Sequence, residues 1–184
     1  MNIFVLDKDP KLCAQAHCDK HVVKMCIEYA QLLSTAARLR GFEHGGYRST
    51  HERHPCTIWA AKDLRNWGWL LRLAYQLGTE YTFRYDRIHK STEALHYLPK
   101  DLIAEVAREV EPPRSFALAM PDEYKDQDVV KAYRAYYLGA KREIAVWTKR
   151  SSPAWWESAV SKTAGSLYDT SSARSSGVHV FQPA

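Results

Sequence analysis

The stretch from His17 to Glu28 carries the densest set of side chains that could do chemistry. It reads HCDKHVVKMCIE, in which His17, His21, Lys24 and Glu28 recur at intervals of three or four residues. In a helix these side chains share one face, opposite an apolar stripe. Two histidines beside a lysine and a carboxylate suit proton transfer on a phosphate-bearing substrate. A solvated polar face is the alternative interpretation.

A second cluster, HERHPC, lies where a polar loop enters a predicted helix. His51, Arg53 and His54 come directly before Pro55, and proline is a preferred first residue of a helix. Because a helix N-terminus with histidine and arginine nearby attracts anions, we expect a phosphate contact here. The alternative is a histidine that only caps the helix, with Arg53 in water.

A metal site is a further alternative for these histidines. His17 and His21 have i, i+4 spacing, and His54 or Cys56 could complete a zinc site, but no single segment has a full ligand spacing. We therefore predict no metal and no cofactor. The cysteines form no C-x-x-C pair and are interpreted as buried thiols: Cys13, Cys18, Cys26 and Cys56.

Basic side chains alternate with aromatic ones in two later stretches. One is the exposed face of a predicted helix at residues 62–76, and the other is Glu80–Lys90, EYTFRYDRIHK. Nucleic-acid grooves combine cations for phosphates with rings for stacking. Tryptophan and tyrosine at helical spacing more often form core, as we expect for Trp59, Trp67, Tyr75 and Trp147. The candidate substrate or DNA contacts are His17, Lys20, Lys24, His51, His54, Arg65, Asn66, Trp69, Arg84, His89 and Lys90.

Helices must position these side chains. Helical spacing begins at Asp9 and Pro10, continues to Arg40 with a break near Cys18 and Asp19, and stops at Gly41. A nearly all-round apolar pattern predicts a central helix over 55–77, stopped by Gly78. Shorter helices are predicted at 79–85, 91–97, 101–110, 126–138 and 140–149. Since no sustained period-two alternation occurs, the prediction is an all-α, compact single-domain bundle with one central buried helix.

Length and composition set the outer limits. The chain has 184 residues, 46% hydrophobic residues and a net charge of +5, which suits one domain with a polyanionic partner. We place the domain at 1–162 and a mobile tail, rich in serine, threonine and glycine, at 163–184. No apolar run approaches the ~20 residues of a membrane span, and the N-terminus reaches Asp7 too early for a signal peptide. We expect a cytoplasmic protein without a membrane partner; its oligomeric state is not predicted.

Several familiar catalytic patterns are missing from the sequence. It has no phosphate-cradling glycine loop, no dinucleotide fingerprint and no G-x-S-x-G elbow. The paired H-x-E and P-C-x-x-C motifs of zinc deaminases are missing as well. These absences argue against P-loop kinases, simple dehydrogenases and deaminases.

Short stretches distributed along the chain resemble known proteins. MNIFVLD, CDKHVVKM, THERHPC, EYTFRY and PAWW resemble a group of small proteins of tailed bacteriophages, most without an assigned function. Over about a third of its length, at its two ends, the chain also resembles the phage pyrimidine-dimer DNA glycosylases of the endonuclease V type. This resemblance implies a small, basic, all-α enzyme that excises damaged pyrimidines, cuts at the abasic site and needs no metal.

The resemblance also implies roles for particular residues. The run that begins at Met1 matches the family's N-terminus, whose free α-amine is the nucleophile, and the bulky Asn2 disfavours removal of Met1. The segment 20–24, KHVVK, lies where the family has Arg-Glu-x-x-Arg. His21 occupies the position of the catalytic glutamate, so Asp19 or Glu28 would supply the carboxylate. Residues 141–156 resemble the family's closing stretch of basic residues, proline and adjacent aromatics.

Three functions remain open from the sequence, and an enzyme is favoured. The first is a DNA N-glycosylase and abasic-site lyase that attacks a damaged or modified pyrimidine nucleotide. The second is another phage enzyme that modifies a base or nucleotide with its His, Asp and Glu side chains. The third is a non-enzymatic protein that binds nucleic acid or a host protein. The catalytic candidates are Met1, Asp19, His21 and Glu28.

Overall fold

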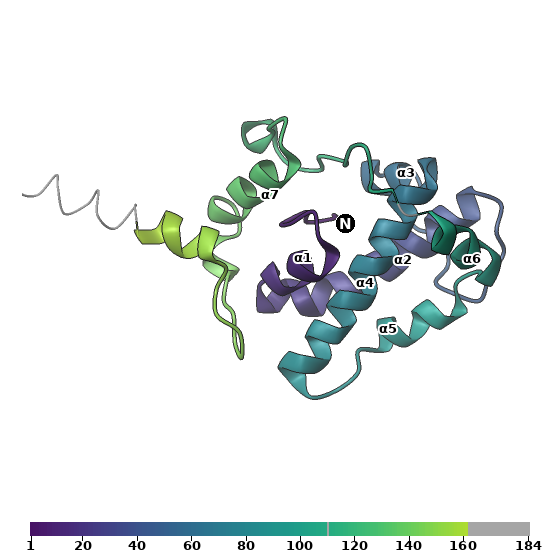
Figure 1. Ribbon diagram of the computed structural model, residues 1–184, viewed down its shortest axis with the longest axis horizontal. Helices are drawn as coiled ribbons and strands as arrows, with labels where there is room; N and C mark the ends of the chain where they lie inside the picture. The colour runs from purple at the N-terminus through teal and green to yellow at the C-terminus, as the bar shows by residue number, and fades with distance from the viewer. Residues whose placement is uncertain (110, 162–184) are drawn as a thin grey trace, which may run out of the picture. The chain divides into compact units, whose positions relative to one another are not determined.

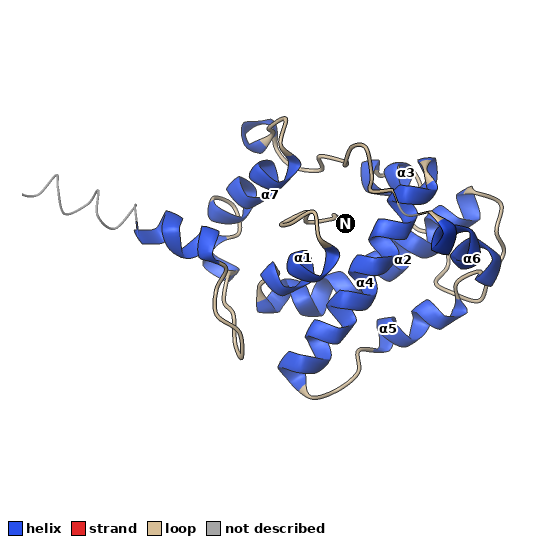
Figure 2. Ribbon diagram, viewed as in Figure 1, coloured by secondary structure: helices blue, strands red, loops and turns tan. Residues whose placement is uncertain are grey.

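The computed structural model describes residues 1–109 and 111–161, and this part of the chain is all-helical, which confirms the predicted fold class. Figures 1 and 2 show helices joined by loops. No described helix is long and apolar enough to cross a bilayer. The helices are α1 (Pro10–Ala16), α2 (Asp19–Leu39), α3 (Pro55–Lys62), α4 (Leu64–Tyr85), α5 (Lys90–Ala94), α6 (Lys100–Arg108) and α7 (Val129–Leu138), with short 3-10 turns η1 (Leu95–Tyr97), η2 (Asp122–Tyr124) and η3 (Arg142–Ile144).

The chain divides into two compact units, Met1–Ser151 and Ser152–Ala184. The first unit ends before the predicted domain boundary at 162. Of the second unit, residues 152–161 are described, and they hold a helix over 154–161. The predicted tail at 163–184 lies outside the described residues.

The break predicted near Cys18 is confirmed. The Asp9 side chain caps α1 by accepting the backbone N–H of Leu12 at 2.9 Å, and Pro10 is its first residue. His17 and Cys18 then take extended backbone angles, so α2 starts in a new direction at Asp19. Asp19 is the first residue of α2 and not its cap, since the N-cap position is occupied by Cys18.

The helix predicted over 55–77 is in fact two helices, and Gly78 does not end the second one. Asp63 has an extended backbone, and its carboxylate accepts the N–H of Arg65 at 2.9 Å, which closes α3 and caps α4. Gly78 lies within α4, where a Cβ would come within 2.5 Å of Thr92 Oγ1. The glycine therefore allows close packing against α5 and does not act as a helix stop.

Helix α4 forms the centre of the first unit. It packs against α1, α2, α3, α5 and α6 (Figure 1). As expected, Trp59 and Trp67 are buried, whereas Tyr75 and Trp147 are only half-buried. Trp69, which was predicted on the exposed basic face, is also buried: its ring packs against Trp59 and Phe116, and its indole N–H donates to the carbonyl of Lys8 at 2.7 Å.

The N-terminal segment, residues 1–6, is irregular and buried. Ile3, Phe4, Val5 and Leu6 are core residues, and the ring of Phe4 contacts Tyr137 of α7 as well as the histidines of the α1–α2 junction. In Figure 1 this purple segment lies beside α1, with α7 on its other side. Phe4 of the segment and Tyr137 of α7 thus cover His21 on the polar face of α2, whereas Lys24 on the same face stays exposed.

The helix predicted at 140–149 does not form apart from the turn η3. Residues 145–151 are irregular and are held by contacts that are distant in sequence. The carboxylate of Asp19 accepts the N–H of Thr148 at 3.0 Å, and the carbonyl of Val146 accepts the N–H of Asp19 at 2.8 Å. These bonds replace the intrahelical ones that the sequence pattern predicted.

Candidate functional site

The α-amine of Met1 lies beside the carboxylate of Glu28, although the two are far apart in sequence. The amine nitrogen is 3.8 Å from Glu28 Oε2, and the same oxygen accepts the backbone N–H of Asn2 at 3.0 Å. Lys24 Nζ lies 3.3 Å from Oε1, one helical turn away. The side chains of Met1 and Glu28 are 3% and 11% exposed. Two candidate catalytic residues, Met1 and Glu28, are therefore brought together, largely buried, beside the exposed side chain of Lys24.

Asn2 fixes the position of that amine. Its side-chain amide donates to the carbonyl of Ala119 at 2.8 Å, and its Oδ1 accepts the N–H of Ile3 at 2.7 Å. The hydroxyl of Tyr133 lies 2.9 Å from the same Oδ1. These contacts hold Asn2 from several sides and so leave Met1 little freedom. Sequence reasoning missed the roles of Asn2 and Tyr133, and no motif or spacing could have indicated them.

The loop before α3 brings two histidines to the same neighbourhood. Nδ1 of His54 accepts the N–H of Cys56 at 3.2 Å, so in the neutral ring the proton is on Nε2. Burial lowers the pKa of His54, the cationic amine of Met1 and His51 lower it further, and Glu28 opposes them. His54 is thus close enough to the amine and to Glu28 for their charges to act on it. It serves both as the predicted cap and as a neighbour of the amine.

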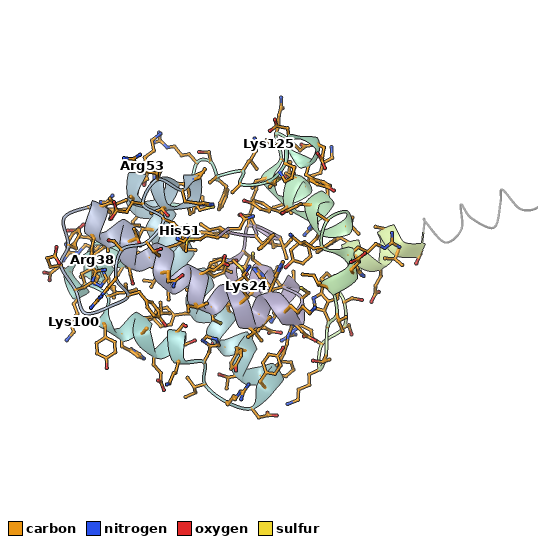
Figure 3. All side chains as sticks on the ribbon, turned by 180° about the vertical axis from the view of Figure 1, so that it is seen from behind. Lys24, Arg38, His51, Arg53, Lys100 and Lys125 are labelled. Atoms are coloured by element: carbon orange, nitrogen blue, oxygen red, sulfur yellow. The ribbon has the colours of Figure 1, made fainter. Side chains whose placement is uncertain are left out.

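Figure 3 labels three side chains on the two segments that carry Glu28 and His54. They are Lys24 on α2, and His51 and Arg53 on the loop that precedes α3. All three side chains are exposed. We refer to Met1, Glu28, His54, His51 and Lys24 as the amine cluster. A nucleophilic amine, a carboxylate, an imidazole and flanking cations suit covalent chemistry on an anionic substrate.

The thiol nearest the amine is not a second nucleophile. Burial raises the pKa of Cys56 to about 12, so the thiol stays protonated at neutral pH. Its sulfur faces Asn2 Oδ1 at 3.9 Å. All four cysteines are unpaired and buried, as the sequence suggested.

His17 is enclosed and cannot act on a substrate. Its Nδ1 lies 2.7 Å from the carbonyl of Cys13, which can only accept, so Nδ1 carries the proton. Nε2 therefore accepts from the hydroxyl of Tyr29 at 2.8 Å, and that hydroxyl accepts the N–H of Phe4. Burial lowers the pKa of His17 to about 4. With both nitrogens committed, His17 is neither a metal ligand nor a substrate contact.

His21 belongs to the same buried cluster. Its Nδ1 hydrogen-bonds the hydroxyl of Tyr137, and its ring stacks on Phe4 at 4.3 Å between centroids. Burial lowers its pKa to about 3, with further contributions from His17, Lys141 and Lys24. Seven residues of helix, about 10 Å, separate His21 from Glu28. The structure thus places this catalytic candidate in the packing beneath the N-terminal segment and not in the amine cluster.

Asp19 and Arg84 form a buried ionic network. Arg84 donates to Asp19 at 2.8 Å, to Glu80 at 2.7 Å and to the carbonyl of Gln15 at 3.0 Å, and its side chain is fully buried. Arg150 also donates to both oxygens of Glu80. Since these charges neutralise one another, the expected proton transfer by Asp19 and phosphate contact by Arg84 are corrected to a structural role.

The remaining candidates do not join the amine cluster. Lys20 is exposed on α2, and His89 and Lys90 lie at the start of α5, where His89 caps the helix by accepting the N–H of Ser91. Arg65 is bonded to Asp63, and Asn66 donates to the carbonyl of Trp59. Among the described residues, no group of three or more His, Cys, Asp or Glu side chains could hold a metal ion.

Because His17 and His21 are buried, we expect the folded protein to lose stability in acid. An unfolded histidine takes up a proton below its ordinary pKa of 6.5, whereas folded His17 and His21 stay neutral down to about 4 and about 3. The unfolded state therefore binds more protons, and the free energy of unfolding should fall by about 2 kcal/mol per histidine between pH 7 and pH 5. Denaturant unfolding at both pH values measures this loss.

The matched variants are H17Q and the exposed-residue control H51Q. H17Q is expected to lose less stability between pH 7 and pH 5 than the parent, whatever its stability at pH 7, and H51Q is expected to behave as the parent does. An unchanged pH dependence in H17Q would show that His17 is not the group responsible.

Comparison of the chain with protein-family models, with curated proteins and with solved structures found no match.

Proposed function

We propose that this protein is a DNA N-glycosylase with abasic-site lyase activity, acting on a damaged or modified pyrimidine nucleotide. The observation that carries the proposal is the α-amine of Met1, held 3.8 Å from the carboxylate of Glu28 at the end of a buried segment. In its neutral form an α-amine is a nucleophile that can form a covalent intermediate with a carbon electrophile.

The reaction requires a nucleophile and a group that moves protons. The lone pair of the neutral amine attacks C1′ of the deoxyribose, and the bond from C1′ to the base breaks with its electron pair going to the base. Opening of the sugar ring then leaves a C=N bond between C1′ and the Met1 nitrogen. The amine's two protons end on the departing base and on O4′. Glu28 is the carboxylate placed to transfer them.

The lyase step follows from the same intermediate. Loss of a proton from C2′ forms a C2′=C3′ double bond and expels the 3′ phosphate. Glu28 is the carboxylate that accepts this C2′ proton. His54 carries its ring proton on Nε2, because Nδ1 accepts the N–H of Cys56, and this Nε2–H donates to the departing phosphate. Lys24, 3.3 Å from Glu28, and Arg53, next to His54 in the sequence, are exposed cations that suit flanking phosphates.

Borohydride trapping tests the proposal. Hydride addition to C1′ converts the C=N bond into a stable amine, so abasic duplex DNA should become covalently attached to the protein. The adduct should map to the Met1 nitrogen by peptide mass analysis. A chain with one extra N-terminal glycine, which moves the amine by about 3.5 Å, should lose the adduct. Absence of an adduct, or an adduct unaffected by the extension, contradicts the mechanism.

A further inference from the structure

A groove lies along α3, and neither Met1 nor Glu28 lines it. It has a volume of about 670 Å³. Trp59 and Ile58 form its apolar part, and Ile58 is half-exposed there. The indole N–H of Trp59 is already bonded to the carbonyl of Ser115, at 2.7 Å. The floor of the α3 groove is therefore apolar, and its polar groups come from the other side chains that line it.

The rim of the α3 groove is positively charged. It carries Lys62, Arg65 and Arg114 against one carboxylate, Asp63. Arg65 is bonded to Asp63 through both guanidinium and backbone, and the two charges compensate. Lys62 and Arg114 are exposed, and neither forms an ion pair with another described residue. Two cations are thus available to an anionic ligand.

The α3 groove adjoins the amine cluster. Pro55, which lines the groove, directly follows His54. At its other side the groove is lined by Ala117, whose carbonyl lies 2.9 Å from the hydroxyl of Tyr133, and that hydroxyl contacts Asn2. From His54 to Lys62 the helix rises about 12 Å, which corresponds to three or four nucleotides at about 3.4 Å each.

We propose that the α3 groove binds the phosphodiester backbone of the nucleic-acid strand that continues from the reacting nucleotide. Lys62 and Arg114 each bind a phosphate. This inference rests on the proposed function, because that function places the reacting nucleotide at Met1. The shape and the positive charge of the groove do not depend on the proposed function. An acidic peptide is also negatively charged. A nucleic-acid strand is favoured because it can reach from the amine cluster into the adjoining α3 groove.

Salt dependence of DNA binding tests the groove. Binding of an abasic-analogue duplex is measured by fluorescence anisotropy over a range of salt concentrations. The slope of log K against log salt is negative, and each lost phosphate contact reduces its magnitude by about 0.9, so K62Q/R114Q should reduce the magnitude by about 1.8. The control is K100Q, an exposed lysine at the start of α6 that does not line the groove (Figure 3). The slope for K100Q should differ from the parental slope by less than about half of the change expected for one lost phosphate contact.

The outcomes separate the groove from the catalytic proposal. A reduced slope in K62Q/R114Q, with K100Q unchanged, supports the groove even where borohydride traps no adduct, which would count against the lyase alone. A parental slope in K62Q/R114Q overturns the groove even where trapping succeeds. Competition by polyglutamate that disappears in K62Q/R114Q, together with a parental DNA slope, would assign the groove to acidic peptides and also overturn the inference.

Discussion

Replacement of Glu28 by glutamine is expected to lower the rate of borohydride trapping on abasic DNA by about 100-fold or more. The carboxylate lies 3.8 Å from the Met1 amine and is the proton-transfer group of the proposed mechanism, and general acid–base catalysis by one side chain typically contributes about 10²–10⁴-fold. Glutamine keeps an oxygen that can still accept the backbone N–H of Asn2, so the N-terminal segment should remain in place. The loss would therefore reflect proton transfer and not misfolding.

Two variants serve as controls for E28Q: one replaces Glu28 with the shorter acid aspartate, and the other removes a carboxylate far from the site. E28D keeps the charge but shortens its reach, so a partial loss of trapping is expected. E105Q removes an exposed carboxylate from α6 and should trap at the parental rate. Thermal unfolding of each variant shows whether the fold is kept. Trapping by folded E28Q at the parental rate would exclude Glu28 as the proton-transfer group.

Replacement of Arg84 by methionine is expected to destabilise the protein by about 3–5 kcal/mol. The side chain of Arg84 is fully buried between Asp19 and Glu80, and removal of one partner leaves buried carboxylates without compensation. Arg150 still binds Glu80, but no other ion pair involving Asp19 is found among the described residues. Denaturant unfolding measures the effect as a shift of the midpoint at an unchanged slope.

An exposed ion pair serves as the comparison for R84M. Lys149 lies 2.5 Å from Asp86, and their side chains are 46% and 79% exposed, so K149M should cost no more than about 1 kcal/mol. R84M also distinguishes the structural role of Arg84 from the phosphate contact expected from the sequence. Loss of DNA affinity in R84M at full stability would show that Arg84 binds phosphate after all.

The local patterns of the sequence predicted the helices with useful accuracy because those signals are short-range. Asp9 with Pro10, and His54 with Pro55, mark helix starts that the structure confirms. The same rules failed at Asp63 and Gly78. Asp63 ends one helix and caps the next, and Gly78 is needed for contact with Thr92, which lies in another element. Periodicity alone contains no information about such contacts.

For the candidate site too, the sequence identified the residues but not which of them meet. Met1 and Glu28 were both candidates from the sequence, but so were Asp19 and His21, and nothing in their spacing separated the two pairs. The structure separates them because the N-terminal segment lies on α2 with its amine at Glu28 and Phe4 against His21. One end of the polar face of α2 is thereby left near the surface, and the other end is enclosed.

The sequence by itself determined the helical composition, the net positive charge and the set of residues able to do chemistry, because residue type and periodicity are local properties of the chain. Only the tertiary structure determined which of those residues meet. Met1 and Glu28 meet across 27 positions of sequence that include an irregular segment and a helix break, and the chain from Asp19 to Arg84 spans three helices. Burial then turned some charged residues into structural pairs and left others near the surface, since a buried charge is stable only with a partner.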